Sequence, residues 1–285
     1  MTKIGIVGVG SIGKRHLSNA MHLGHSVKGY DPLTWPHDFK YERELYDWCD
    51  AAVICTPSPY HESGFRACME RGKHVLIEKP ISVGVGGLST LLDEAENRKL
   101  VVMMGNNLRF HPAIKLMKGA FPVVQWANFI CATKTDKVGY LSDGVILCTG
   151  AHEVDLALHL WGHAEVATAC GDEESIDFVL RHETGMRSSF HLDFTTEVEV
   201  RQIRFADPVE SVMVDLPERT MRQDFGNGVY RQNRFAGSYD DDYVEELEAF
   251  VAAIHGEPLE GASGEDGLET LGILLDIQKR IKNTS

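Results

Sequence analysis

The chain has 285 residues, of which 43% are hydrophobic and 25% charged, and 42 acidic against 28 basic side chains give a net charge of −14. Length and composition indicate a globular protein with room for two domains. The acidic excess argues against nucleic acid or an anionic membrane as the main partner, because both bind basic surfaces.

No apolar run reaches the ~18 residues of a membrane span, and no cleavable leader opens the chain. The six cysteines form no C-x-x-C pair, and several lie in apolar runs. Buried reduced thiols are therefore favoured over a disulfide framework. Together these features predict a cytoplasmic protein without a membrane segment.

The chain begins with an apolar run over residues 4–7 that leads into Gly8-Val9-Gly10-Ser11-Ile12-Gly13. This is the G-x-G-x-x-G pattern between a strand and a helix. Its first glycine permits a tight turn, its second lets a pyrophosphate approach the backbone, and its third lets the helix pack closely. The free N–H groups and positive end of that helix attract the phosphate charge. The motif predicts a dinucleotide site.

Asp31 follows the second apolar segment, about 20 residues beyond the glycines. A carboxylate at this position accepts hydrogen bonds from the ribose hydroxyls of NAD and repels the 2'-phosphate of NADP. No arginine occurs in residues 32–36. The sequence therefore favours NAD over NADP, with a simple turn before Pro32 as the alternative role of Asp31.

Up to about residue 118, short apolar runs alternate with amphipathic stretches of helical length, which predicts a doubly wound parallel sheet. The expected strands are 3–7, 26–30, 51–55, 74–77 and 100–104, and the expected helices are 12–23, 60–71 and 85–98.

From residue 123 onward, period-two alternation predicts a sheet with one open face. The expected strands are 123–130, 178–181, 188–194, 198–205 and 211–215, and the expected helices are 151–161, 239–253 and 264–282. Three aspartates at 240–242 are interpreted as a solvated helix start rather than a metal cluster.

Two motifs follow predicted parallel strands, at the edge where a doubly wound sheet binds its ligand. Thr56 and Pro57 come after the third strand and either line the cofactor pocket or only turn the chain. Glu78-Lys79-Pro80 comes after the fourth. Beside a nicotinamide ring, Lys79 could bind a substrate oxygen and stabilise alkoxide charge. The alternative is that Lys79 is a surface side chain, as the lysine of an isolated E-K-P sequence more often is.

The predicted helix 151–161 carries His152, Asp155 and His159 at spacings that place them on one face. A histidine there can act as a general base toward an alcohol, with a carboxylate orienting it. A zinc site is a weaker alternative, because Leu156 occupies the place of the second histidine in H-E-x-x-H. A structural His–Asp pair is the other alternative.

In this order the glycine turn, T-P, E-K-P and H-x-x-D-x-x-x-H resemble the glucose-fructose oxidoreductase and inositol dehydrogenase family, written Gfo/Idh/MocA. The densest match covers residues 55–61 and 72–82, and the segments 109–112 and 264–268 are also similar to the family's. The resemblance implies a Rossmann domain over residues 1–119. It further implies an α/β domain over 120–285 with a large open, mostly antiparallel sheet, through which homodimers or homotetramers form.

The resemblance also implies residue roles. Lys79 matches the lysine that assists proton transfer, Asp155 the neighbouring carboxylate and His159 the general acid/base, while His152 helps to bind substrate. The residues assigned to the cofactor are Gly8, Gly10, Ser11, Ile12, Gly13, Asp31, Thr56, Pro57, His61, Glu78 and Lys79. The residues assigned to the substrate are Lys79, Arg109, His152, Asp155 and His159. No metal is expected. Cys148 departs from the acidic residue that many relatives carry.

The expected activity is hydride transfer between NAD and a carbinol or keto carbon of a sugar, sugar derivative or cyclitol. Two alternatives stay open at this point. One is an NAD-dependent glycosidase that acts by transient oxidation, as some members of the family do. The other is an NAD-binding regulator without turnover.

Overall fold

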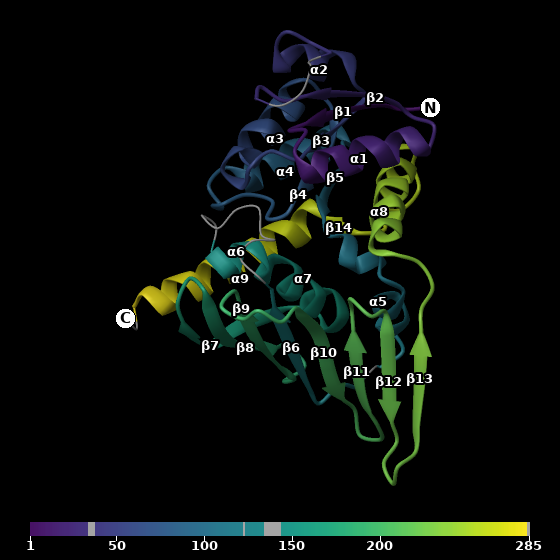
Figure 1. Ribbon diagram of the computed structural model, residues 1–285. Coiled ribbons are helices and arrows are strands. Elements are labelled where there is room, and N and C mark those ends of the chain that lie inside the picture. Colours follow the sequence, from purple (N-terminus) through teal and green to yellow (C-terminus); the bar gives the residue numbers. More distant parts are fainter. Residues whose placement is uncertain (34–37, 122, 134–143, 284–285) are drawn as a thin grey trace. The chain divides into compact units, whose positions relative to one another are not determined.

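The computed structural model describes residues 1–33, 38–121, 123–133 and 144–283 (Figure 1). These residues form two compact units. The first unit comprises Met1–Phe110 and Asp240–Leu271, and the second comprises His111–Tyr239 and Gly272–Ser285. The expected fold class, a Rossmann sheet followed by an α/β domain with a larger, mostly antiparallel sheet, is confirmed.

The first unit is built on a six-stranded sheet in the order β14-β5-β4-β3-β1-β2. Its strands are β1 (Lys3–Val7), β2 (Ser26–Tyr30), β3 (Ala51–Ile54), β4 (His74–Glu78), β5 (Val102–Gly105) and β14 (Ala262–Ser263). All pair in parallel except β14, which runs antiparallel to β5. The central strands are continuous apolar runs because helices cover both faces of such a sheet, and every residue of β3 is 0% exposed.

The helices of this unit are α1 (Ser11–His22), α2 (Glu42–Trp48), α3 (His61–Glu70), α4 (Leu88–Arg98) and α8 (Tyr239–Ile254), with the short turns η1 (Ser58–Tyr60) and η2 (Asn107–Phe110). Helix α8 lies beside α1 (Figure 1): the rings of His16 and Tyr243 are 5.6 Å apart, and Arg15 pairs with Asp240 at 2.8 Å. Asp240 lies in the first turn of the helix as expected, but Asp242 is 2% exposed rather than solvated.

Residues 240–271 group with the first unit because Leu247 and Phe250 pack into the same hydrophobic core as Ile4 and Ile6. The division by compactness therefore differs from the expected boundary between residues 119 and 120. The assignment of cofactor binding to one domain and substrate binding to the other stays a prediction.

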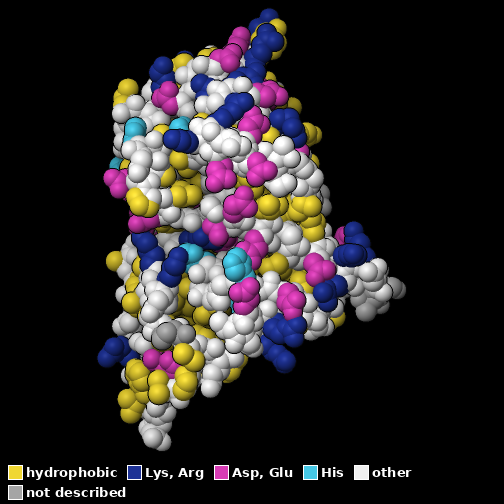
Figure 2. All heavy atoms as spheres, turned by 180° about the vertical axis from the view of Figure 1, so that it is seen from behind, with side chains coloured by type: hydrophobic (Ala, Val, Ile, Leu, Met, Phe, Trp, Pro, Cys, Tyr) yellow, Lys and Arg dark blue, Asp and Glu magenta, His cyan; other side chains and the backbone are white. Residues whose placement is uncertain are grey.

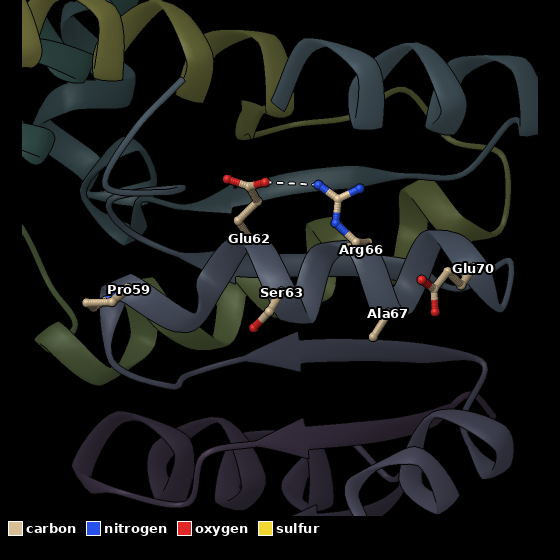
Figure 3. Close-up of a pocket in the computed structure, with 6 residues that line it drawn as sticks. All are labelled: Pro59, Glu62, Ser63, Arg66, Ala67 and Glu70. Atoms are coloured by element: carbon tan, nitrogen blue, oxygen red, sulfur yellow. Dashed lines mark hydrogen bonds and ion pairs between the residues drawn. The ribbon is translucent and has the colours of Figure 1, made fainter. Parts of the chain in front are cut away.

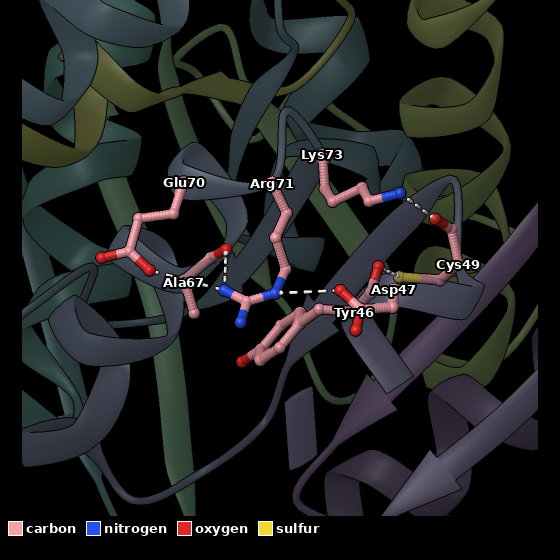
Figure 4. A network of polar contacts seen from close by, with 7 residues as sticks. All are labelled: Tyr46, Asp47, Cys49, Ala67, Glu70, Arg71 and Lys73. Carbon is pink, nitrogen blue, oxygen red and sulfur yellow. Dashed lines mark hydrogen bonds and ion pairs between the residues drawn. The ribbon is translucent and has the colours of Figure 1, made fainter. Parts of the chain in front are cut away.

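Helix α2 is absent from the sequence-based expectations, because seven residues are too few to establish a helical period. Polar contacts attach it to α3 (Figure 4). Arg71 donates from Nε to the Asp47 carboxylate at 3.2 Å, and Lys73 donates to the Cys49 carbonyl at 2.8 Å. The guanidinium of Arg71 lies 5.8 Å from the ring of Tyr46, which is 1% exposed.

The second unit contains an eight-stranded sheet in the order β13-β12-β11-β10-β6-β9-β8-β7. Its strands are β6 (Trp126–Ala132), β7 (Ala164–Gly171), β8 (Ser175–His182), β9 (Arg187–Asp193), β10 (Val200–Ala206), β11 (Ser211–Asp215), β12 (Thr220–Asp224) and β13 (Tyr230–Arg234). Only the β6–β9 pair is parallel among these ladders.

The helices of the second unit are α5 (Pro112–Met117), α6 (Gly144–Cys148), α7 (Gly150–Trp161) and the end of α9 (Gly264–Lys282). Buried and exposed residues alternate along β8 and β9, and the buried face holds stacked rings. Phe178 and Phe190 lie 4.4 Å apart, and Phe129 lies 4.7 Å from Phe190. Trp161 at the end of α7 meets Phe129 edge-on at 5.8 Å, so this core holds α7 against the sheet.

Acidic and basic side chains of the described residues are interspersed on the face shown in Figure 2. None of the helices within the described ranges combines the length and apolar character that a membrane crossing requires.

His111 caps α5 as a neutral ring. Its Nδ1 accepts from the Ala113 N–H at 3.1 Å, while Nε2 lies 3.3 Å from the Leu216 carbonyl oxygen, to which it donates. Burial, together with the charge of Arg219, lowers the pKa of His111 from 6.5 to about 4.

We expect His111 to make folding sensitive to mild acid. The pKa of His111 is lower in the folded protein than the ordinary 6.5. Its contribution to the free energy of unfolding is therefore fully present above pH 6.5. As the pH falls toward about 4, the free energy of unfolding decreases by about 3 kcal/mol, because the folded protein resists protonation of this ring. His111→Asn keeps an acceptor for Ala113 and removes the titrating ring. Urea unfolding at about pH 7 and about pH 5 should therefore show a smaller loss in the variant; parallel losses would contradict the assignment.

Candidate functional site

The glycine turn after β1 packs tightly against the end of β3. Gly8 has a φ of +86°, and a Cβ atom there would lie 2.7 Å from the Cys55 carbonyl oxygen. A Cβ on Gly13 would lie 1.9 Å from the carbonyl oxygen of Gly8. Side chains are therefore excluded at both positions, by backbone conformation at the first and by close packing of α1 at the second.

Gly10 differs, because a Cβ atom there would meet no heavy atom of the described residues within 4 Å. Gly10 and Ser11 are exposed, and Ile12 is half-buried in the first turn of α1. No side chain caps this helix, and its first turn contains no acidic residue. The open space and the helix end fit a pyrophosphate, as the sequence predicts.

Asp31 lies just beyond β2, and both of its carboxylate oxygens accept backbone hydrogen bonds. Oδ2 accepts from the Val9 N–H and Oδ1 from the Leu33 N–H, each at 2.9 Å. Asp31 thus supports the turn around Pro32 and joins the end of β2 to the glycine turn, while its predicted contact with the ribose stays a prediction. A carboxylate oxygen has two lone pairs and can accept more than one hydrogen bond.

The predicted motifs of the first unit follow neighbouring strands. Asp31 follows β2, the glycine turn follows β1, Thr56 follows β3, and Lys79 follows β4. Because these strands are parallel, their carboxyl ends share one edge of the sheet. This edge is where doubly wound sheets bind ligands.

Two polar side chains on this edge are buried without a hydrogen-bond partner among the described residues. They are the hydroxyl of Thr56 and the amide of Asn107, whose oxygen and nitrogen are both unbonded. Buried polar groups usually have partners, so both are candidates for ligand contacts. Asn107 is missing from the sequence-based assignment. Its position directly after β5, as Thr56 follows β3, is the signal that could have identified it.

Glu78 is 8% exposed and sits at the end of β4. Its Oε1 lies 2.9 Å from Nε2 of the fully buried His16. Burial raises the pKa of Glu78, but the hydrogen bond with His16 and the charges of His16, Lys79 and His61 outweigh burial, so the pKa lies below its ordinary value. Glu78 is thus a buried carboxylate that its surroundings hold in the ionised form. Its predicted cofactor contact stays a prediction.

His61, at the start of α3, is 1% exposed. Its Nε2 lies 2.7 Å from the Thr56 carbonyl oxygen, and its Nδ1 lies 2.7 Å from the Pro80 carbonyl oxygen. It therefore connects the loop after β3 with the loop after β4, and its predicted cofactor contact also stays a prediction.

Arg109 in η2 is 7% exposed. Its Nη1 donates to the Gly261 carbonyl at 2.9 Å and pairs with Asp266 at 3.3 Å. The charge of Arg109 helps to lower the pKa of Asp266, against the effect of burial. These contacts hold the start of α9 near β5. The predicted substrate contact of Arg109 stays a prediction.

In the second unit, His152, Asp155 and His159 lie on α7 as expected. His152 is 5% exposed, Asp155 is 0% exposed and His159 is half-buried. The Lys118 ammonium lies 3.4 Å from Nδ1 of His159. On α7, Glu153 forms a separate buried ion pair with Arg201 at 2.7 Å. The helix therefore carries two histidines and a buried carboxylate at the expected positions, and their role in proton transfer stays a prediction.

An open hollow of about 350 Å³ runs along α3 (Figure 3). It contains an ion pair between Glu62 and Arg66 at 3.0 Å. Its lining residues are Pro59, Glu62, Ser63, Arg66, Ala67 and Glu70, none of which is a predicted site residue.

Comparisons with known proteins show which proteins this chain resembles. A family model described as "Oxidoreductase family, NAD-binding Rossmann fold" matches residues 33–106. The myo-inositol 2-dehydrogenase of Thermotoga maritima is 25% identical over 93% of this chain and 92% of its own length.

Among solved structures, the UDP-N-acetylglucosamine 3-dehydrogenase of Acidithiobacillus ferrooxidans has a TM-score of 0.90 at 22% identity, covering 99% of this chain and 98% of that chain. An inositol dehydrogenase homolog from Azotobacter vinelandii, complexed with NADH and myo-inositol, has a TM-score of 0.82 at 14% identity, covering 99% of this chain and 96% of that chain. These structural likenesses establish the shared fold.

Two glycine substitutions should distinguish the glycine that leaves room for the ligand from the glycine that close packing requires. Gly10→Ala should change the free energy of unfolding by less than about 0.5 kcal/mol and raise the NAD dissociation constant at least about tenfold, because its methyl group enters open space. Gly13→Ala should destabilise the fold by about 1–3 kcal/mol, because its methyl group meets the Gly8 carbonyl. Urea unfolding and NAD titration measure both effects. Equal losses of stability would contradict the distinction.

Proposed function

The chain belongs to the Gfo/Idh/MocA family of NAD-binding oxidoreductases, and on that premise we propose that it transfers a hydride between NAD and a carbinol or keto carbon of a sugar, sugar derivative or cyclitol. The observation that carries the proposal is the single sheet edge at which the glycine turn, Thr56 and Lys79 follow adjacent parallel strands. It joins a nucleotide-binding turn to a cationic side chain, which is the combination that alcohol oxidation needs.

Bound NAD supplies the hydride acceptor at its nicotinamide ring. In the proposal, the N–H groups of Ser11 and Ile12 at the start of α1 bind the pyrophosphate, with Gly10 providing the space. Asp31 accepts from the ribose, and its charge favours NAD over NADP. Thr56 and Asn107 supply polar contacts, because their side chains otherwise stay buried and unsatisfied among the described residues.

The proposed proton acceptor is His159, which removes the hydroxyl proton as the substrate is oxidised. Asp155, four residues earlier on α7 and fully buried, favours the charged form of that ring. Lys79 binds the substrate oxygen and stabilises its developing charge, and His152 contacts the substrate. In the reducing direction His159 returns the proton.

We further propose that the protein forms a homodimer or homotetramer through the sheet of the second unit. In support, strands of this sheet carry exposed apolar side chains, among them Trp126 on β6 and Met213 on β11, which are 41% and 39% exposed.

Removing either proton-handling residue should cut turnover and spare cofactor binding. We expect Lys79→Ala and His159→Ala to lower kcat by about 10²–10⁴-fold, with NAD dissociation constants within about threefold of wild type. Initial rates of NADH formation with a panel of sugars and cyclitols measure this. Lys279→Ala and His22→Ala change exposed residues of the same types and serve as controls.

Wild-type turnover in either variant would overturn the residue assignment. Free NADH accumulation supports the dehydrogenase itself. Glycoside cleavage without net NADH would replace it with the hydrolase, and ligand binding without either reaction would replace it with the regulator.

Asp31 should set the preference between cofactors. Asp31→Asn removes the charge and keeps one oxygen that can accept from one of the two backbone N–H groups. We therefore expect the dissociation-constant ratio of NADP to NAD to fall about tenfold, with a smaller loss of thermal stability than in Asp31→Ala. Asp31→Ala should lower the ratio similarly and also lower the melting temperature, because the Val9 N–H loses its partner. An unchanged ratio in both variants would remove Asp31 from cofactor selection.

A further inference from the structure

His61 makes two short contacts that a neutral histidine cannot satisfy. Its two ring nitrogens each lie 2.7 Å from a backbone carbonyl oxygen, one of Thr56 and the other of Pro80. A carbonyl oxygen only accepts hydrogen bonds, and a neutral imidazole has only one N–H. Both contacts are hydrogen bonds only if both nitrogens are protonated. Otherwise a nitrogen lone pair would face an oxygen lone pair in a site that is 1% exposed.

Other buried histidines of this chain have contacts that suit the neutral ring. Nδ1 of His111 accepts from the Ala113 N–H while its Nε2 faces a carbonyl. His182 places Nδ1 2.9 Å from the Gly162 carbonyl and Nε2 2.9 Å from the Ser188 hydroxyl, which can donate as well as accept. The double-carbonyl arrangement of His61 is therefore not a general consequence of burial.

A buried cation needs compensating negative charge, and the neighbourhood of His61 supplies it. Glu78 on β4 is ionised. The charge of His61 helps to lower the pKa of Glu78, as do His16 of α1 and Lys79. Burial raises the pKa of the Cys55 thiol, just before Thr56, and the negative charges of Glu78 and Glu246 raise it further. The negative charge of Glu78 therefore lies near the ring of His61 at this end of the sheet and can compensate for its positive charge.

We propose that His61 is a permanently protonated positioning residue, an imidazolium that ties the loop carrying Thr56 to the loop carrying Lys79. It acts through these loops, because each of its ring nitrogens lies against a backbone carbonyl of one of them. Its effect on turnover rests on the proposed function of Lys79, whereas its protonation and its two hydrogen bonds do not. The carbonyl of Pro80 is one residue from Lys79, so losing that bond releases the lysine's own loop.

The protonation state is tested directly on the wild-type protein without NAD. Two-dimensional ¹H–¹⁵N NMR that detects histidine ring nitrogens should show both nitrogens of His61 protonated at a pH well above the ordinary histidine pKa of about 6.5. Under the same conditions Nδ1 of His111 should be unprotonated. The absence of the signals in His61→Gln assigns them. A neutral tautomer of His61 at that pH would overturn the proposal.

Two conservative variants test the two bonds separately, because the amide nitrogen of asparagine occupies the place of Nδ1 and that of glutamine the place of Nε2. His61→Gln keeps a donor for Thr56 and loses the bond to Pro80. Amide hydrogen exchange should then rise in residues 79–84 and stay unchanged in 55–60, and kcat should fall about tenfold at constant NAD affinity.

His61→Asn should show the reverse pattern, with faster exchange in residues 55–60 and an NAD dissociation constant raised about tenfold. The matched changes His22→Gln and His22→Asn, at an exposed histidine of α1, should alter neither segment. Identical exchange patterns in the two His61 variants would overturn the two-bond assignment. A wild-type protein that binds NAD but oxidises no sugar or cyclitol would overturn the proposed function and leave the NMR and exchange results valid.

Discussion

The buried carboxylate of Glu78 is the charge around which the candidate site is organised. It lies at the end of the central strand β4, with His16 of α1 at hydrogen-bond distance and the charges of Lys79 and His61 nearby. Burying an isolated carboxylate is costly, and nearby cations and hydrogen bonds compensate for that cost. Because His16 comes from α1, His61 from α3 and Lys79 from the loop after β4, the same electrostatic requirement holds these elements together at one sheet edge.

Close backbone packing gives the same edge its shape. Gly8 and Gly13 bring β1, α1 and the end of β3 so near to one another that no side chain fits between them. Gly10 stands in the same turn but faces open space. Glycine therefore serves packing at two positions and ligand access at the third, which explains how one motif builds a rigid turn and a cradle together.

Elements with strong apolar periodicity could be predicted, and those held by other forces could not. The runs at 3–7, 26–30 and 211–215 form strands with those bounds, and in β1 burial explains this, because four of its five residues are buried. β12 and β13 are polar strands whose ladder hydrogen bonds are invisible to a hydrophobic pattern, and β7 has a single buried residue. The short helix α2 depends on its contacts with α3.

The sequence by itself determined the fold class, the nucleotide-binding turn and the order of the motifs along the chain, because each depends on local spacing and burial. Only the tertiary structure decided the surroundings of the side chains. In the folded chain, residues 240–271 belong to the first unit, and Arg109 pairs with Asp266. The Asn107 amide is buried without a hydrogen-bond partner among the described residues. It also placed His61 between two carbonyl groups. Such contacts join residues far apart in sequence, and spacing along a chain carries no information about which charges and carbonyls meet after folding.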